Sequence, residues 1–170
     1  MLKLLITLRK KLVLVVECTL ILLMAALLID VLWQVASRYL LQDPSSWTDE
    51  LATLLIIWVA MLGSSIAFAR HHHLGVDYFV EKLAPSARRI TEMAVQAMVG
   101  LFAVVVLILG GSKLVALTLL TEQVSPALGV KMGHVYLALP ISGLLILLVA
   151  METMVGQFQA PEASRREDKA

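Results

Sequence analysis

The sequence predicts an all-α membrane protein with four transmembrane helices, on the evidence of its composition, its apolar stretches and the placement of its basic residues. Hydrophobic residues make up 59% of the 170 residues and charged residues only 16%, whereas soluble domains carry about a quarter charged residues. A hydrocarbon core about 30 Å thick needs about 20 mostly apolar residues per helix. Four such spans occur, at about 12–33, 48–69, 88–115 and 134–156. We therefore expect one four-helix membrane domain over residues 1–158.

Lysine and arginine are distributed unevenly over the segments outside the spans. Eleven lie before the first span, between the second and third, or after the fourth, whereas only Arg38 and Lys131 lie in the other two loops. Basic residues accumulate on the cytoplasmic side of membrane proteins. We therefore predict that both termini and the middle loop are cytoplasmic, and that the loops at Arg38 and Lys131 lie on the outer side.

The segments that flank the second span have patterns of their own. Ser46, followed by Asp49 three residues later, indicates a capping box that starts the second span. Apolar residues recur at helical spacing over residues 74–84, which predicts a short amphipathic helix in the cytoplasmic interface. Residues 159–170 are rich in charge and are expected to form a flexible cytoplasmic tail.

Small residues gather on one face of the second span. Ala60, Gly63, Ser64 and Ala67 follow the i, i+3, i+4, i+7 spacing of a helix face. Such faces let helices approach closely in lipid, where packing drives association. Packing within this subunit is the favoured interpretation, and a face for another protein is the alternative.

The histidines do not form a recognisable metal or haem site. His71, His72 and His73 are consecutive, and consecutive helical side chains point about 100° apart, so they cannot all reach one ion. A haem anchor needs histidines on facing helices at similar depth, whereas the triple histidine and His134 lie at opposite ends of the spans. We expect no metal site, and an interfacial role for the triple histidine.

The remaining ionisable residues of the spans lie near the span ends. Glu17 is an intramembrane acid, which suits a proton-coupled carrier, but Lys10 and Lys11 lie nearby and favour a salt-bridged or snorkelling acid. Asp30 and Lys113 both fall near outer ends and are expected to pair with each other. No nucleophile with a base and no phosphate-binding loop occurs, so we expect no enzymatic activity.

Several motifs, taken in order, resemble the small membrane subunit (DctQ type) of tripartite ATP-independent periplasmic (TRAP) transporters. They are Arg38-Tyr39, Pro44, Trp47-Thr48-Asp49-Glu50, Trp58, Leu62-Gly63, Arg70-His71-His72-His73-Leu74-Gly75-Val76-Asp77, Ser125-Pro126-Ala127-Leu128-Gly129 and Tyr136-Leu137-Ala138-Leu139-Pro140. The resemblance covers roughly residues 12–155, and Lys131 departs from it, since an apolar residue or proline is expected there.

The resemblance implies a scaffold subunit of a sodium-coupled, binding-protein-dependent secondary transporter that imports an organic acid, in a bacterial inner membrane. Its implied partners are a large multi-span membrane subunit, which it stabilises, a periplasmic substrate-binding protein, which it helps to dock, and membrane lipids, with no nucleic acid. Sodium is expected in the large subunit, a bound phospholipid is compatible with the family, and no cofactor is expected in this chain. C4-dicarboxylates, sialic acids, keto acids and sulfonates all remain open as substrates.

The resemblance also singles out residues for partner binding or structure. Those at the periplasmic side are Arg38, Trp47, Asp49 and Glu50, those at the cytoplasmic side are Arg70, His73 and Asp77, and Pro140 lies in the last span. Arg38 is expected to pair with Asp49 or Glu50 and so to hold the outer loop in shape. Two alternatives from other classes stay open: an autonomous proton-coupled carrier that uses Glu17, and the membrane anchor of a redox complex. An autonomous carrier usually shows internal repeats and helices broken at the midplane, and the sequence shows neither pattern.

Overall fold

The computed structural model describes residues 2–42, 45–70 and 85–167 of the chain. Its helices are α1 (Leu2–Tyr39), α2 (Ser46–Ala69), α4 (Pro85–Phe102), the π-helical segment η1 (Ala103–Gly110), α5 (Gly111–Leu120), α6 (Met132–Tyr136) and α7 (Ala138–Glu167). Four stretches are long and apolar enough to cross a membrane: Lys11–Tyr39, Ser46–Ala69, Met93–Leu120 and Met132–Met154. The prediction of four spans is confirmed. The predicted interfacial helix at 74–84 lies outside the described residues, as do His73 and Asp77.

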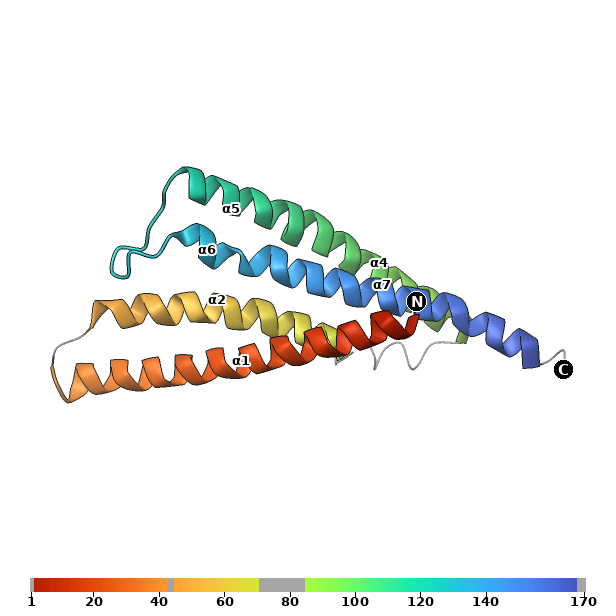
Figure 1. Cartoon of the computed structure of the whole chain (residues 1–170), viewed down its shortest axis with the longest axis horizontal. Helices are drawn as coiled ribbons and strands as arrows, with labels where there is room; N and C mark the ends of the chain where they lie inside the picture. The colour runs from red at the N-terminus through yellow and green to blue at the C-terminus, as the bar shows by residue number, and fades with distance from the viewer. Residues whose placement is uncertain (1, 43–44, 71–84, 168–170) are drawn as a thin grey trace.

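The four spans lie side by side in one row instead of closing into a bundle (Figure 1). Helix α1 packs on α2, α2 packs on α7, and α7 packs on the arm formed by α4, η1 and α5. In the most apolar stretch of α1 no residue is buried, whereas 39% of the residues are buried in the corresponding stretch of the fourth span. Helix α1 is therefore an edge of the row, and α7 lies in its interior.

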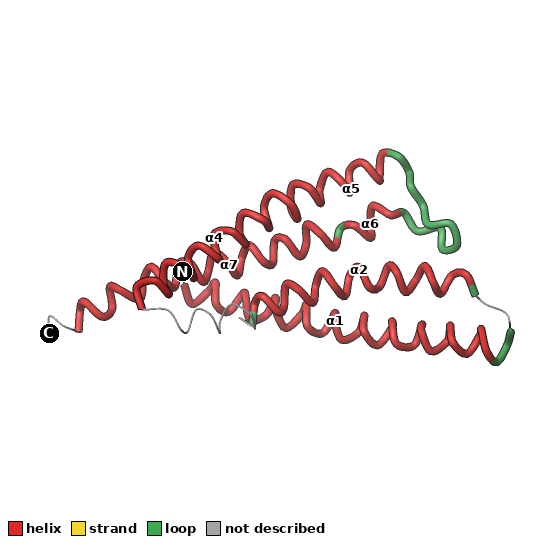
Figure 2. Tube along the Cα trace, turned by 180° about the vertical axis from the view of Figure 1, so that it is seen from behind, coloured by secondary structure: helices red, strands yellow, loops and turns green. Residues whose placement is uncertain are grey.

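The two ends of the row differ. Both chain termini lie at one end, which we call the terminal end, and the connections after α1 and α5 lie at the other, which we call the loop end (Figure 1). The helices converge at the terminal end, while the α1–α2 hairpin and the arm spread apart toward the loop end, and the view from behind shows the same arrangement (Figure 2). Termini at one end agree with an even number of spans.

The buried apolar core lies where α2, η1 and α7 meet. It consists of Phe68, Ala69, Ala103, Leu107, Ile146, Val149 and Ala150. Because lipid is as apolar as these side chains, the cluster gains stability from close packing and dispersion and not from removal of water. Small residues make that close packing feasible.

Two glycines allow α7 to approach the η1–α5 arm. A Cβ atom at Gly143 would lie 2.7 Å from Leu107 Cβ, and one at Gly111 would lie 2.9 Å from Leu139 Cβ and 3.1 Å from Pro140 Cδ. Real Cβ atoms essentially never come closer than 3.0 Å to another atom. These contacts place Pro140, a motif residue of the sequence analysis, against the glycine that starts α5.

The fourth span is broken close to the loop end. Helix α6 ends at Tyr136 and α7 begins at Ala138. Pro140 has no N–H to donate to the carbonyl of Tyr136, four residues earlier, and its ring crowds that carbonyl. The break lies one to two turns from the start of the span at Met132, and not at the midplane position that carriers use.

Helix α7 continues to Glu167, through most of the segment that was expected to be a flexible tail. The helix runs through Pro161, and Glu162, Ala163, Arg165 and Arg166 after it are good helix formers. The tail that the sequence predicts at 159–170 is thus helical as far as Glu167.

Candidate functional site

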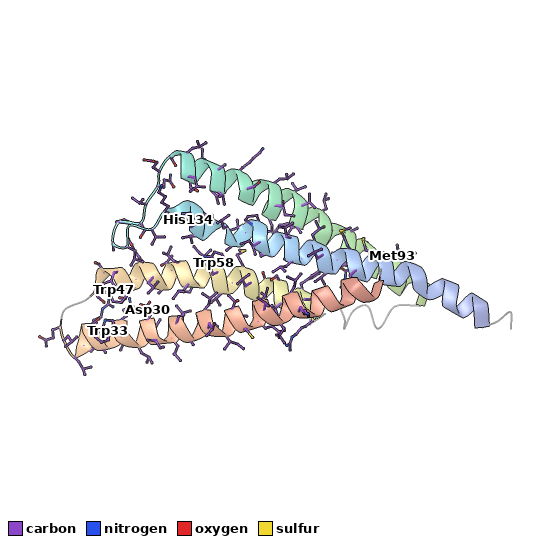
Figure 3. All side chains as sticks on the ribbon, in the orientation of Figure 1. Asp30, Trp33, Trp47, Trp58, Met93 and His134 are labelled. Carbon is purple, nitrogen blue, oxygen red and sulfur yellow. The ribbon has the colours of Figure 1, made fainter. Side chains whose placement is uncertain are left out.

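Polar side chains of α1 meet the start of α2 at the loop end. Gln34 Nε2 donates a hydrogen bond to Asp49 Oδ1. One turn further along α1, the hydroxyl oxygens of Ser37 and Ser45 lie 3.4 Å apart, and Ser37 Oγ also donates to the carbonyl of Gln34 at 3.0 Å. Trp33 and Trp47 flank these contacts (Figure 3) and are both well exposed. The hairpin is therefore joined by side-chain hydrogen bonds at this end.

The start of α2 differs from the predicted capping box by one residue. The N-cap is Ser45, and α2 begins at Ser46. Thr48, three residues after the cap and fully buried, donates its hydroxyl to the carbonyl of Ser45 at 2.8 Å and lies 3.0 Å from Ser45 Oγ. The predicted Ser46–Asp49 box is wrong because Asp49 instead receives the hydrogen bond from Gln34.

Glu50 connects α2 to the connection between α5 and α6, residues 121–131, which we call the outer loop. Its carboxylate accepts a hydrogen bond from the hydroxyl of Ser125. It also accepts hydrogen bonds from the backbone N–H groups of Ala127 and Leu128, both at 3.0 Å. Charged acceptors make stronger hydrogen bonds than neutral ones. Glu50 thus connects the two halves of the row at the loop end, where their helices spread apart.

The outer loop is closed on itself by backbone hydrogen bonds. Ser125 N–H donates to Val130 O and Gly129 N–H donates to Ser125 O, both at 2.9 Å. Gly129 has φ of +66°, a left-handed conformation that suits glycine. The loop therefore presents a defined shape, and the sequence motif from Ser125 to Gly129 is the part that Glu50 binds.

Arg38 does not form the expected ion pair. It is exposed, and within residues 2–42, 45–70 and 85–167 no ion pair or hydrogen bond of its side chain is found. Ser37 faces α2, and Arg38 is the next residue along the helix. The Arg38 side chain is therefore turned about 100° away from the face of α1 that meets α2. Gln34 takes the position beside Asp49 that Arg38 was expected to fill, and the predicted pairing with Asp49 or Glu50 is wrong.

An ion pair joins α1 and α2 toward the terminal end. Arg70, the residue that caps α2, donates from Nε to Glu17 Oε1 at 2.8 Å, and its Nη2 lies 2.6 Å from the same oxygen. The Glu17 side chain is 24% exposed and that of Arg70 57%. Glu17 is thus a salt-bridged acid, as the sequence favoured, but its partner is Arg70, 53 residues away.

Most of the small-residue face of α2 is exposed. Ala60, Ser64 and Ala67 are all exposed, and only Gly63 meets a neighbouring helix, because a Cβ there would lie 3.9 Å from Leu20. The buried residues in this part of α2 are instead Leu62, Ser65, Phe68 and Ala69. Packing within the subunit uses Gly63 alone among the four, so the rest of that face is available to lipid or another protein.

Asp30 and Lys113 do not pair. Asp30 lies on α1 between α1 and α2 (Figure 3), whereas Lys113 is exposed on α5, at the other edge of the row. A row of helices keeps its first and third spans apart, which a closed bundle would not. In the described part of the chain no group of three His, Cys, Asp or Glu side chains is placed to hold a metal ion.

Sequence reasoning missed the polar face of α1. Asp30, Gln34 and Ser37 are spaced i, i+4, i+7 in an otherwise apolar span, which is the spacing of one helix face. That pattern alone predicts a polar contact with a neighbouring helix. What it cannot specify is that the neighbour is the start of α2.

These features define a class: a four-span membrane protein whose helices form a flat row and are joined by polar contacts near the two ends. The sequence profile described as "Tripartite ATP-independent periplasmic transporters, DctQ component" matches residues 27–160. The chain belongs to this family, which confirms the resemblance found in the motifs. Members of the family are transporter components and not enzymes. The chain is accordingly a multi-pass protein of the inner membrane.

Individual relatives carry more specific names. The chain is 39% identical over 87 residues to the sialic acid TRAP transporter small permease protein SiaQ of Vibrio cholerae, covering 50% of each chain. It is 35% identical over 66 residues to the sialic acid TRAP transporter permease protein SiaT of Haemophilus influenzae, covering 39% of this chain and 11% of that one. A Haemophilus influenzae protein named as a TRAP transporter small permease protein is 29% identical over 132 residues. The match covers 78% of this chain and 80% of that protein. The match thus spans half the length of the Vibrio cholerae relative.

Proposed function

We propose that this chain is the scaffold subunit of a sodium-coupled, binding-protein-dependent secondary transporter that imports an organic acid. Its partners in this proposal are a large multi-span membrane subunit, which would carry the sodium and substrate sites, and a periplasmic substrate-binding protein. The observation that carries the proposal is the flat row of four spans. A row leaves both of its faces free, so one face can bind a partner along the whole membrane depth while the other meets lipid.

The small-residue face of α2 supports a contact with the large subunit. Ala60, Ser64 and Ala67 lie exposed on α2, one helix in from the edge formed by α1. Helices in lipid associate by van der Waals packing, which small residues favour because they let backbones approach closely. We assign the large subunit to this face, with phospholipid filling what the partner leaves open.

The loop end supports docking of the binding protein. Glu50 holds the outer loop against α2, and Trp47 and Arg38 are exposed at the same end of the row. A docking surface gains affinity when its loops are ordered before binding, because less conformational entropy is lost. The loop end then faces the periplasm and both termini the cytoplasm, in keeping with the distribution of basic residues.

Sialic acid is the first substrate to test. Two relatives carry sialic acid in their names, but the selective residues of such a system should lie in the binding protein and the large subunit. C4-dicarboxylates, keto acids and sulfonates are therefore the comparison substrates.

The alternative of an autonomous carrier coupled through Glu17 receives less support. The Glu17 carboxylate is held by Arg70 at 2.6 Å, whereas a coupling acid must release and rebind its proton as the carrier turns over. No contact described above favours a redox anchor.

The test is reconstitution of the transporter with and without this chain. The large subunit and the binding protein are placed in proteoliposomes with an inward sodium gradient, and uptake of labelled sialic acid is measured. Uptake should need this chain, and the chain alone should show neither uptake nor proton-linked efflux. Full uptake by the large subunit and binding protein without this chain would reject the scaffold role.

A further inference from the structure

We propose that Asp30 and Asp49 bind a sodium ion between α1 and α2, at a site within the small subunit itself. The site lies among the polar side chains that join the hairpin at the loop end, and it is separate from any sodium site in the large subunit.

The first observation is a buried carboxylate with no partner. Asp30 is only 6% exposed, and neither of its carboxylate oxygens makes a hydrogen bond with any of the described residues. Buried polar groups are nearly always hydrogen-bonded, because leaving them unpaired costs free energy. An unpaired carboxylate at this depth therefore indicates that something further binds it.

Protonation of Asp30 does not by itself satisfy both of its carboxylate oxygens. A neutral carboxyl group carries an O–H that needs an acceptor, and its second oxygen would still have no donor among the described residues. A bound cation, by contrast, would satisfy both oxygens at once.

The second observation is the charge around Asp30. Asp49 lies across the hairpin from the face of α1 that carries Asp30, because Gln34, one turn after Asp30, donates a hydrogen bond to Asp49 Oδ1. None of the three basic residues toward the loop end compensates for these charges, and Lys131 is exposed in the outer loop. Arg38 is exposed without a partner among the described residues, and Lys113 lies exposed on α5. Two acids on facing sides of the hairpin, with no basic side chain among the described residues paired to either, favour the binding of a positive ion.

The donor atoms suit a hard monovalent ion. The two carboxylates supply oxygens, and because the Gln34 nitrogen already donates to Asp49, its amide oxygen stays free to accept. Oxygen ligands select hard cations. A divalent ion such as calcium usually takes six to eight oxygens, commonly from several carboxylates, and no third acid, His or Cys joins this pair in the described chain.

The burial of Asp30 limits the size of the occupant. Both of its oxygens are covered in the isolated chain, so the ammonium or guanidinium group of a partner subunit cannot reach them without separating α1 from α2. Asp30 and Gln34 lie one turn apart on the face of α1 that meets α2. A small ion held between that face and Asp49 would thus also join the two helices.

The test uses the purified full-length chain in detergent, so that the large subunit contributes no sodium site. Thermal unfolding is followed at constant ionic strength while sodium chloride replaces choline chloride. An ion that binds only the folded state raises the Tm with its concentration. The wild type should show such a rise, Asp30→Asn should abolish it, and Glu122→Gln, which removes an exposed acid of the outer loop, should retain it.

Binding of radioactive sodium by the same three proteins gives a second readout, which does not depend on stability. If Asp30→Asn fails to fold, Asp49→Asn takes its place. Equal Tm shifts in the wild type and Asp30→Asn would overturn the proposal. A wild-type Tm that responds to pH but not to sodium would overturn it as well, because the carboxyl group would then take a proton. These results do not depend on the transport assay, so the scaffold proposal can fail or stand separately.

Discussion

The guanidinium group of Arg70 binds the carboxylate of Glu17 across 53 residues of sequence, with its Nε 2.8 Å from Glu17 Oε1. This ion pair joins α1 to the end of α2 toward the terminal end of the row, while Gln34 and Asp49 join the same two helices at the loop end. Helix α1 packs mainly on α2, so these two contacts join it to its main neighbour at both ends of the hairpin.

Arg70→Gln and Glu17→Gln should each lower stability slightly, and the two changes together should not add. Exposed ion pairs contribute up to about 1 kcal/mol, and a double-mutant cycle isolates that coupling. Reversible unfolding in detergent measures it. The matched control pairs Glu17→Gln with Arg38→Gln, which should be additive because Arg38 is exposed and has no partner among the described residues. Full additivity of the Glu17 and Arg70 changes would argue against the pair.

Glu50→Gln should loosen the outer loop. A glutamine side chain has one acceptor oxygen and no charge, so it cannot hold the Ser125 hydroxyl and two backbone N–H groups as the carboxylate does. Hydrogen exchange at the Ala127 and Leu128 amides should become faster, and uptake by the reconstituted transporter should fall. Glu122→Gln, in the same loop, serves as the control. Unchanged exchange in Glu50→Gln would show that the outer loop is held by other contacts.

Gly143→Ala should destabilise the packing of α7 on η1. The added Cβ would lie 2.7 Å from Leu107 Cβ and 3.0 Å from Ile108 Cγ1, and overpacking of this kind costs about 1–3 kcal/mol. Gly100→Ala is the control, because nothing lies within 4 Å of a Cβ there, and alanine favours the helix. Thermal unfolding in detergent should separate the two variants, and equal Tm values would contradict the close contact.

Ser64→Phe should weaken binding of the large subunit without unfolding the chain. Ser64 is exposed on the small-residue face of α2, and a phenyl ring would hold a partner helix away from it. Copurification of the tagged chain with the large subunit measures the loss. Ala116→Phe, at an exposed position on α5, should copurify as the wild type does. Normal copurification of Ser64→Phe would assign this face to lipid.

Single cysteines should report the orientation of the row. In a Cys18→Ser background, Gln42→Cys and Lys131→Cys should react with a membrane-impermeant maleimide added to intact cells with a permeable outer membrane. Ser164→Cys should react only after the inner membrane is opened. The reverse pattern would place the loop end in the cytoplasm and remove the docking role assigned to it.

The spans were predictable because each depends on a local property, the length of an apolar stretch relative to the bilayer. The pairs of side chains that meet from distant parts of the chain were not predictable. The expected pairs of Arg38 with Asp49 or Glu50, and of Asp30 with Lys113, assumed that opposite charges at one depth would meet. Arg38 is turned away from α2 by a single residue of helix rotation, and Lys113 lies at the far edge of a row where a bundle would have brought it closer.

The number of spans, the family and the motif residues could all be read from the order of residues, because apolar length and motif order do not depend on how the helices pack. Helix packing was needed to show that the spans lie in a row, that Arg70 is the partner of Glu17, that Glu50 holds the outer loop and that Asp30 is buried with no partner among the described residues. The reason is physical: lipid is as apolar as the helix surfaces, so hydrophobicity alone does not select which faces meet. That choice depends on a few small residues and polar contacts whose partners are distant in the sequence.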